Sequence, residues 1–416
     1  MFRRARPGFG SPNSSSLRAF CACLSRALPW RGRSPPSCWR SGRIARKNAA
    51  CCETHAARRE GEDVLISVVV VTYQSAHCLP ACLRSLEQAN GASRMELILV
   101  DNASPDETKA LLDAYERRTD LPFARVQTLA LSENRGYAYA NNRGLALAQG
   151  DLLLLLNPDT VVTPDAIVRC AAVLKDEASF RAEAAVALAS TAGPVSTSDP
   201  VSSSGTFIDA AHAVQAQGAR IGVVGCRLEL PDGTLDRACK RSFPTLTNSF
   251  FRFSGLSLLF PQSKRLAAYN LTYLEERGSF PVESVCGAFL LTTREVYEQV
   301  GDLDEDYFMY GEDLDWCYRI KRQGFGVWYE GGVTTLHLKG GNGGKRSAAS
   351  LRHFYQTMLI FFQKHYKNRY PVLVFHLVRV GLAVLFYSHI TVQNVRGRRD
   401  RPSSNFLCIE SKKREM

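Results

Sequence analysis

The chain has 416 residues, enough for two or three domains or for one large α/β domain with appendages. Its 45% apolar and 22% charged residues are typical of a soluble protein with a core. The net charge of +12 does not indicate a nucleic-acid groove, because the first 60 residues hold 13 of the 52 basic and 2 of the 40 acidic residues, which leaves 39 against 38 in the rest. Thirteen cysteines without paired CxxC motifs indicate thiols in a reducing compartment.

Residues 1–62 form a basic N-terminal extension rich in Arg, Ser, Pro and Gly. They show no apolar period, so we expect disorder. A transit-like peptide and an upstream start codon wrongly included in the reading frame both fit this composition.

Order is expected from residue 63 onward, where apolar runs alternate with helical patterns. Buried strands are predicted at 65–71, 95–100, within 124–131 and at the five leucines 152–156. A helix is predicted to begin at Ser104, the N-cap of a capping box that ends at Glu107. The alternation predicts a parallel, doubly wound α/β sheet with right-handed crossovers.

Polar residues follow three of these strands: Thr72-Tyr73, Asp101-Asn102 and Asp159. In a parallel sheet such ends lie along one edge, where ligands bind. Taken alone, Asn157-Pro158-Asp159 reads as a tight turn, since these residues favour turns for local reasons. The convergence of the three ends favours a second role, in which Asp159 holds a divalent metal.

The second half is less regular. Residues 178–219 are a low-complexity insertion, and 243–266 form an apolar, aromatic segment that resembles a lid or an acceptor-side element. A buried strand is predicted at 285–291, and a short helix between Thr293 and Gly301.

An acidic and aromatic stretch, GDLDEDYFMYGEDLDWCYR, begins at Gly301. Glu312 and Asp313 fall in the first turn of a predicted helix, where carboxylates stabilise the helix dipole. Aromatic neighbours would also dry the site and raise the basicity of a carboxylate, so a catalytic role remains open. His337 is either a structural histidine or a metal ligand. The KGGNGGK loop from Lys339 to Lys345 is either a connector or a diphosphate-closing loop.

Residues 350–395 are predicted as C-terminal membrane-associated helices, followed by a basic polar tail at 396–416. The apolar run 371–390 nearly has the length of a membrane span. His376, Arg379 and His389 interrupt it, which favours an amphipathic helix lying on the bilayer over a spanning one.

The chain resembles the family 2 glycosyltransferases, and most of all their rhamnosyltransferase-like branch. Five motifs carry the resemblance in the family's order: SVVVVTYQSAHCLPACLRSL, LILVDNASPDET, ENRGYAYANNRGLALAQGDLLLLLNPDTVV, CGAFLLTTREVYEQVGDLDEDYFMYGEDLDWCYRIKRQGFGVWY and the later His337. The resemblance implies a GT-A fold over 63–345 and inverting transfer from a nucleotide-sugar. It implies dTDP-rhamnose as the donor, with galactofuranose, glucose or mannose donors as alternatives, and a saccharide or lipid-linked saccharide acceptor in cell-surface polysaccharide synthesis.

The same resemblance assigns roles to residues by their position in its motifs. It implies Asp313 as general base with Glu312 beside it, and Mg²⁺ or Mn²⁺ held by Asp159 and His337. The donor nucleotide would be bound by Thr72, Tyr73, Asp101, Asn134, Arg135, Gly136 and Asn157. The acceptor side would include Gly287, Ala288, Tyr310 and Trp316.

Other functions fit the sequence less well. A nucleotidyltransferase would carry a glycine-rich basic loop after the first strand, and a Rossmann dehydrogenase would carry GxGxxG there; neither is present. An inactive, nucleotide-sugar-binding protein is a further alternative, against which Asp159, Asp313 and His337 argue. No nucleic-acid partner is expected. We expect a cytoplasmic enzyme associated peripherally with the inner face of the membrane.

Overall fold

The structure is a computed structural model that describes residues 64–175, 220–339 and 347–399. These residues belong to one compact unit, Asp63–Met416. The predicted extension at 1–62, the insertion at 178–219, most of the loop at 339–345 and the tail beyond residue 399 lie outside the described residues.

The first half alternates strands and helices as the sequence predicts. Its elements are β1 (Ile66–Thr72), α3 (Leu79–Glu87), η2 (Ala92–Arg94), β2 (Met95–Asp101), α4 (Thr108–Glu116), β3 (Arg125–Ala130), α5 (Tyr137–Leu145), β4 (Leu152–Leu156), β5 (Thr160–Val162) and α6 (Ala166–Lys175).

The leucine run forms β4, and all five leucines are buried. Burying a leucine side chain contributes about 1.5–3 kcal/mol, so this strand is strongly fixed in depth and direction. β1 and β2 are buried along their whole length as well. The turn that follows β4 therefore starts from a rigid support.

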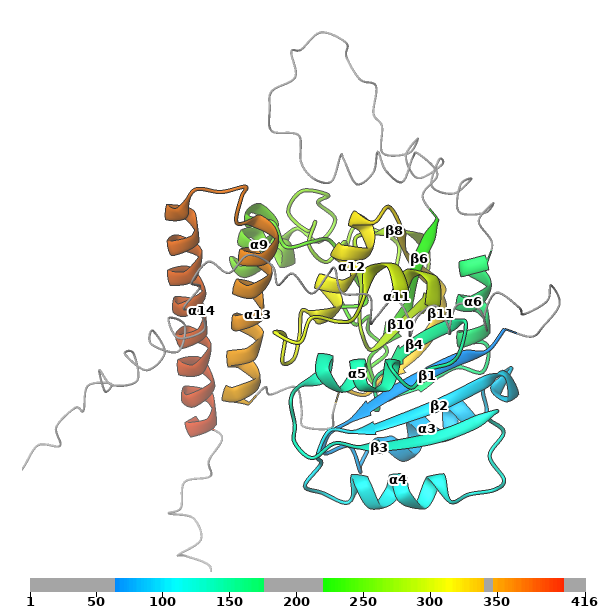
Figure 1. Cartoon of the computed structure of the whole chain (residues 1–416). Helices are drawn as coiled ribbons and strands as arrows, with labels where there is room; N and C mark the ends of the chain where they lie inside the picture. The colour runs from blue at the N-terminus through cyan, green and yellow to red at the C-terminus, as the bar shows by residue number, and fades with distance from the viewer. Residues whose placement is uncertain (1–63, 176–219, 340–346, 400–416) are drawn as a thin grey trace, which may run out of the picture. The chain divides into compact units, whose positions relative to one another are not determined.

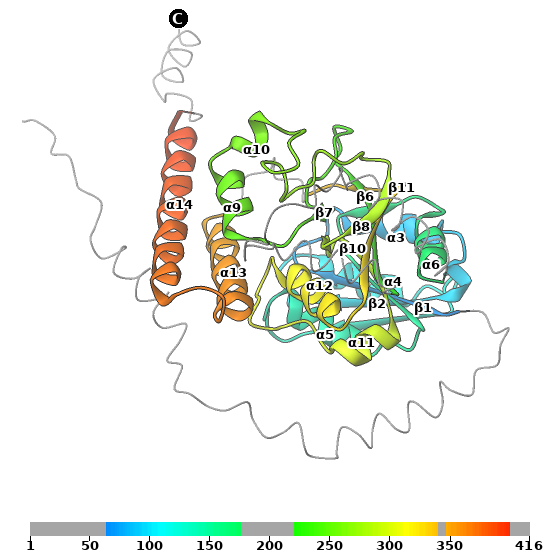
Figure 2. The ribbon, with the colours of Figure 1, turned by 90° about the horizontal axis from the view of Figure 1, so that it is seen from above.

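The helices α4 and α5 cover opposite faces of this part of the sheet (Figures 1 and 2). α5 lies very close to β1 and β2: a Cβ added at Gly144 would lie 2.5 Å from Val69 Cγ1. The predicted start of α4 at Ser104 is wrong. The helix begins at Thr108, with Glu107 as its N-cap and no side-chain cap. The Ser104 amide instead donates to the Asp101 carboxylate. This hydrogen bond closes a turn in the residues that follow β2.

The second half completes a mixed sheet. Its elements are β6 (Ile221–Glu229), β7 (Lys240–Arg241), α9 (Leu246–Phe253), α10 (Leu256–Leu259), β8 (Ser279–Val282), β9 (Ser284–Val285), β10 (Phe289–Thr293), α11 (Arg294–Val300), α12 (Glu312–Arg322) and β11 (Gly326–His337). As predicted, Thr293 caps α11 and Gly301 ends it.

The strand order is β3-β2-β1-β4-β10-β6-β11-β5, and β8 pairs with β11. β1 to β4 are parallel, whereas β10 runs antiparallel between β4 and β6. This confirms the predicted α/β class with flanking helices, the arrangement expected of a GT-A fold. The sheet is mixed, because β10, β5 and β8 run antiparallel to their neighbours.

The antiparallel pairs position the functional segments. β10 runs back along β4, so Phe289 pairs with Leu156 and the residues before β10 lie beside the turn after β4. β11 pairs with β5, which sets His337 opposite Thr160. His337 therefore lies next to Asp159, although the two residues are far apart in the sequence.

Two long helices follow, α13 (Ala348–Tyr366) and α14 (Val372–Arg399), and they lie side by side (Figures 1 and 2). Within α14, Val372–Gln393 is long and apolar enough to cross a membrane, with a mean hydropathy of 1.7. α13 packs against the sheet domain through Phe361, whose ring lies 5.6 Å from that of Tyr318 in α12.

Candidate active site

The ends of β1 and β2 form the first part of the site. Thr72 pairs with Asp101 across the two strands. Both are buried, and the Thr72 hydroxyl donates to the Asp101 carboxylate at 3.4 Å. Tyr73 is 43% exposed. Tyr73 is therefore open to a bound nucleotide, whereas Thr72 and Asp101 are buried beneath it and hydrogen-bonded to each other.

Asn134, Arg135 and Gly136 lie close to these strand ends. The Asn102 side-chain amide donates to Asn134 Oδ1 at 2.9 Å, and the Gly136 amide donates to the same oxygen at 3.0 Å. Gly136 has φ +102°, and a Cβ there would lie 2.5 Å from the Phe308 carbonyl oxygen, so only glycine fits. Asn102 was visible in the sequence as a strand-end residue but was given no role; it joins β2 to this loop.

Tyr137 connects the turn after β4 to the residues between β9 and β10. Its hydroxyl donates to Asn157 Oδ1 at 2.8 Å and lies 3.3 Å from the Gly287 carbonyl oxygen. The Asn157 amide donates to the Ala288 carbonyl at 3.1 Å. Asn157, Gly287 and Ala288 are thus brought together, which unites a predicted donor-side residue with two predicted acceptor-side residues.

Asp313 lies one further step along this chain of contacts. Its Oδ2 accepts from the Gly287 amide at 3.0 Å and from Arg241 Nη2 at 2.7 Å. Asp313 and Arg241 are both buried. Arg241 comes from the two-residue strand β7, and no feature of the sequence pointed to it. The buried guanidinium supplies a counter-charge and a charge-assisted hydrogen bond to this carboxylate.

Glu312 differs from its neighbour. It is buried, and its Oε2 has no hydrogen-bond partner among the described residues. Burial, followed by the nearby charge of Asp313, raises the pKa of Glu312 to about 8. Glu312 therefore holds its proton at neutral pH. The pair occupies the first turn of α12, as predicted.

His337 lies between two aspartates. Its Nδ1 is 2.9 Å from Asp236 Oδ2, and its Nε2 is 3.4 Å from Asp159 Oδ1. Burial disfavours the imidazolium, but the contacts with Asp159 and Asp236 outweigh it and raise the pKa of His337 to about 9. Asp236 also accepts from Lys339 Nζ at 2.8 Å. Asp236 follows a DG turn and carried no sequence signal for this role.

These side chains fit a divalent metal with few protein ligands. In the part of the chain that the structure describes, no three His, Cys, Asp or Glu side chains gather as a metal cluster. Asp159 Oδ1 and His337 Nε2 do face each other, the surroundings favour positive charge there, and a metal bound there would replace the proton on Nε2. Mg²⁺ or Mn²⁺ bound to phosphates keeps only one or two protein ligands and completes its shell with water. Asp236 would then orient the ring, as carboxylates do behind metal-bound histidines.

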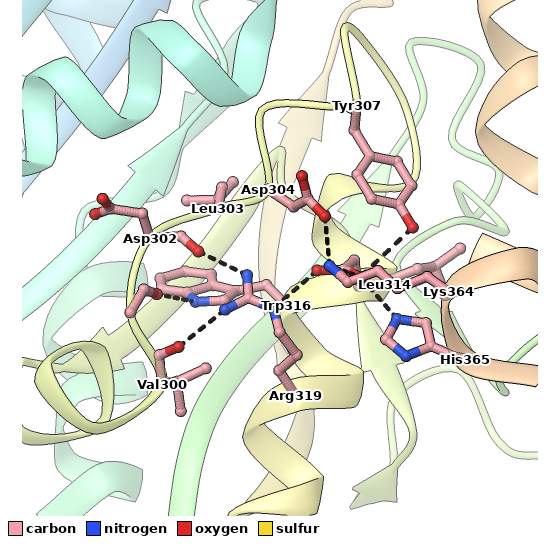
Figure 3. Close-up of polar contacts among 12 residues, drawn as sticks. Val300, Asp302, Leu303, Asp304, Tyr307, Leu314, Trp316, Arg319, Lys364 and His365 are labelled. Atoms are coloured by element: carbon pink, nitrogen blue, oxygen red, sulfur yellow. Dashed lines mark hydrogen bonds and ion pairs between the residues drawn. The ribbon is translucent and has the colours of Figure 1, made fainter. Parts of the chain in front are cut away.

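Tyr310 and Trp316 lie in different surroundings. Tyr310 adopts φ +68° just before α12, and its hydroxyl lies 2.8 Å from Ser350 Oγ in α13. Trp316 is fully buried and donates from Nε1 to the Gly301 carbonyl at 3.0 Å (Figure 3). Trp316 is a core residue behind the acidic helix, so the prediction that places it on the acceptor side is not retained.

Asp315 fixes the acidic helix to α13. Its carboxylate accepts from His365 Nε2 and Lys364 Nζ, each at 2.7 Å, and from Arg319 Nε at 2.8 Å. Figure 3 shows Arg319, Lys364 and His365 together with the Tyr307 ring. Burial opposes ionisation, but the hydrogen bond from His365 and the charges of Lys364 and Arg319 hold the pKa of Asp315 well below its usual range. The position of Glu312 and Asp313 thus depends on α13.

Comparison with known proteins places the chain in a class. Residues 67–180 match the family model described as glycosyl transferase family 2. The chain is 26% identical over 341 residues to the N-acetylglucosaminyl-diphospho-decaprenol L-rhamnosyltransferase of Mycobacterium tuberculosis, covering 79% of this chain and 94% of that protein. It is also 36% identical over 93 residues, 22% of each chain, to the Bacillus subtilis protein named uncharacterized glycosyltransferase YfnE.

Among solved structures, the chain is similar to a mannosyltransferase from Pyrobaculum calidifontis in complex with GDP-Man and Mn²⁺. The identity is 15%, the TM-score is 0.44, and 89% of each chain is covered.

The chain is therefore a glycosyltransferase. Its features are a mixed α/β sheet, aspartates after the strands and a helix that begins with Glu312 and Asp313. Residues 67–180 match glycosyl transferase family 2, and over 79% of its length the chain is similar to an L-rhamnosyltransferase.

Proposed function

We propose that the protein transfers a sugar from a nucleoside-diphosphate donor to a hydroxyl of a saccharide or lipid-linked saccharide, with inversion at the anomeric carbon. One observation carries this proposal: Tyr137 and Gly287 join Asn157, in the turn that carries Asp159, to Asp313 in the acidic helix. A diphosphate-binding turn and a proton acceptor are thereby held on a common support. A direct displacement needs both groups and no covalent intermediate.

The donor would lie along the carboxyl ends of β1, β2 and β4. Asp101 would accept a hydrogen bond from the base, while Asn134, Arg135 and Gly136 would lie near the sugar-diphosphate. Arg135 is available because its side chain is half exposed and rests 4.0 Å over the Tyr139 ring. Rhamnose linked to dTDP is the donor we propose, because the chain is similar over 79% of its length to an L-rhamnosyltransferase.

Asp313 would remove the proton from the acceptor hydroxyl. Such general-base catalysis typically contributes about 10²–10⁴-fold. Arg241 and the Gly287 amide both donate to one oxygen of this carboxylate and fix its orientation. Glu312, protonated at neutral pH, would keep a second negative charge out of the site.

Asp159 and His337 would hold Mg²⁺ or Mn²⁺, which supplies Lewis-acid stabilisation of the departing diphosphate when bound. Asp236 would fix the ring of His337 so that Nε2 faces Asp159. We place the enzyme at the inner face of a membrane, in cell-surface polysaccharide synthesis, with the C-terminal helices as its membrane contact.

A panel of nucleotide-sugars tests this function. We expect dTDP-rhamnose with Mn²⁺ to raise the melting temperature the most. A bound ligand adds RT ln(1 + [L]/Kd) to the free energy of unfolding, so the donor that binds most tightly gives the largest shift. Transfer should require both Asp313 and a divalent ion. Turnover that is unchanged in EDTA contradicts the metal requirement, and wild-type transfer by Asp313→Asn contradicts the assignment of the base. Donor binding without hydrolysis or transfer by the wild type, across the panel of acceptors, would favour an inactive binding protein.

A further inference from the structure

The short helices α9 and α10 expose an unusual amount of apolar surface. Phe250, Leu258, Leu259 and Phe260 are each between 52% and 72% exposed. They lie close together in sequence, on two short helices and the residue that follows them. Single exposed apolar residues are normal on a protein surface, but such a group marks an interaction site.

The helix α14 exposes a second group of apolar side chains. Val372, Leu373, Leu377, Val380 and Val384 are between 59% and 72% exposed. Only 6% of the apolar window of α14 is buried. A helix that is apolar on most of its open sides requires an apolar surrounding, and a flat partner surface would cover only one side.

The helix α13 joins these two groups. The Tyr355 ring of α13 lies 6.4 Å from Phe253 of α9 and 6.1 Å from Phe386 of α14. Figure 2 shows α9 and α10 on the same side of the molecule as α13 and α14. The exposed apolar residues therefore belong to neighbouring helices that share one aromatic contact region.

Both segments also lack acidic residues. Residues 237–274 contain six Lys and Arg and no Asp or Glu, but Lys240 and Arg241 among them are buried. Residues 347–393 contain five and none, of which Lys364 is paired with Asp304 and Asp315. Arg252, Lys264 and Arg265 accompany the apolar group of α9 and α10. Cations beside apolar side chains match an anionic lipid surface. Two copies of such a surface would instead repel each other, which argues against self-association.

We propose that α9 and α10, together with α14, bind the surface of an anionic phospholipid bilayer. The side chains of Phe250, Leu258, Leu259 and Phe260 enter the interface as a second contact, separate in sequence from the C-terminal helices. α9 begins five residues after Arg241, which contacts Asp313. The bilayer is thereby held near the proposed base. This consequence rests on the proposed function and favours an acceptor whose saccharide is attached to a membrane lipid.

Vesicle sedimentation of the full chain tests the contact. The probe is a phosphatidylcholine vesicle with or without phosphatidylglycerol. The double variant Leu258→Asp/Leu259→Asp should bind anionic vesicles at least about tenfold more weakly than the wild type, although α14 is intact. Leu111→Asp is the matched control, because Leu111 is an exposed leucine of α4 far from this surface in sequence. It should bind as the wild type does.

A second variant leaves the apolar residues in place. Lys264→Glu/Arg265→Glu changes two exposed cations and should weaken binding to anionic vesicles while leaving binding to neutral vesicles unchanged. Wild-type vesicle binding by both double variants overturns the proposal, as does an equal loss in Leu111→Asp. Loss of a dimer in the variants with unchanged vesicle binding overturns it in favour of a second copy. Stabilisation by nucleotide-sugar is measured on each variant and reports separately on the proposed function.

Discussion

Arg241 Nη2 lies 2.7 Å from Asp313 Oδ2, and both side chains are buried. Burial disfavours a charged carboxylate, and a buried guanidinium at hydrogen-bond distance favours it. Arg241 thus supplies the counter-charge next to the acidic pair. Arg241 lies in β7, which pairs with β9 just before Gly287, so the same two-residue pairing aligns the arginine and the glycine amide on one oxygen.

Arg241→Met should remove this counter-charge while keeping most of the side-chain volume. Removing one partner of a buried ion pair costs about 3–5 kcal/mol in the free energy of unfolding. Transfer should fall as well, because the carboxylate loses its orientation. Chemical denaturation and steady-state kinetics check both effects. Arg237→Met, at an exposed arginine four residues away, should change stability by less than about 0.5 kcal/mol. Equal stability of the two variants would contradict the role of Arg241.

Tyr137→Phe should separate the two halves of the site without removing bulk. Loss of the hydroxyl leaves Asn157 Oδ1 without this hydrogen-bond donor, which costs about 1–3 kcal/mol in the free energy of unfolding. A displacement of about 1 Å between the turn after β4 and Asp313 can lower kcat about 10²-fold. Tyr139→Phe, two residues along α5, is the matched control. We expect kcat to fall only in the Tyr137 variant, and parallel kinetics for both would count against the connection.

The sequence could predict the parts of the site that follow from local patterns. Apolar runs predict β1, β2 and β4, and the polar residue after each run lies where a parallel sheet ends. Asp101, Asp159 and the Glu312-Asp313 turn were predicted in this way. His337 was found only through the resemblance, since a lone histidine carries no local signal.

Other residues could not be predicted, because tertiary pairing alone brings them to the site. Arg241 depends on the register of β7 against β9, and Asp236 depends on a turn whose direction the sequence does not specify. Trp316 shows the opposite error. It stands in the acidic motif, but it points from α12 into the core and packs against Tyr297 of α11.

Asp236→Asn tests the orientation of His337 by a measurement other than turnover. Outer carboxylates behind metal-bound histidines typically contribute about 10–100-fold in metal affinity. We expect Mn²⁺ affinity, measured by electron paramagnetic resonance in the presence of nucleotide, to fall by that factor. Asp232→Asn, in the exposed turn nearby, should have no such effect. If His337→Ala abolishes Mn²⁺ binding and Asp236→Asn leaves it unchanged, the metal site stands and the role of Asp236 does not.

The raised pKa of Glu312 predicts how the free energy of unfolding depends on pH. Burial and the charge of Asp313 raise its pKa from an ordinary value of 4.5 to about 8 in the folded protein. Between these two values folding takes up a proton, so the wild type loses stability from this group as pH rises from about 4.5 to about 8. Glutamine cannot ionise, and Glu312→Gln should avoid this loss.

The stability of Glu312→Gln relative to the wild type should therefore rise across that window, with a slope of at most about 1.4 kcal/mol per pH unit, and level off above it. Urea denaturation at a series of pH values measures the difference, with Glu298→Gln at an exposed position of α11 as the matched control. If the stability of Glu312→Gln relative to the wild type stays constant from about pH 5 to about pH 8, Glu312 is ionised in the folded protein. That result would contradict the raised pKa of Glu312.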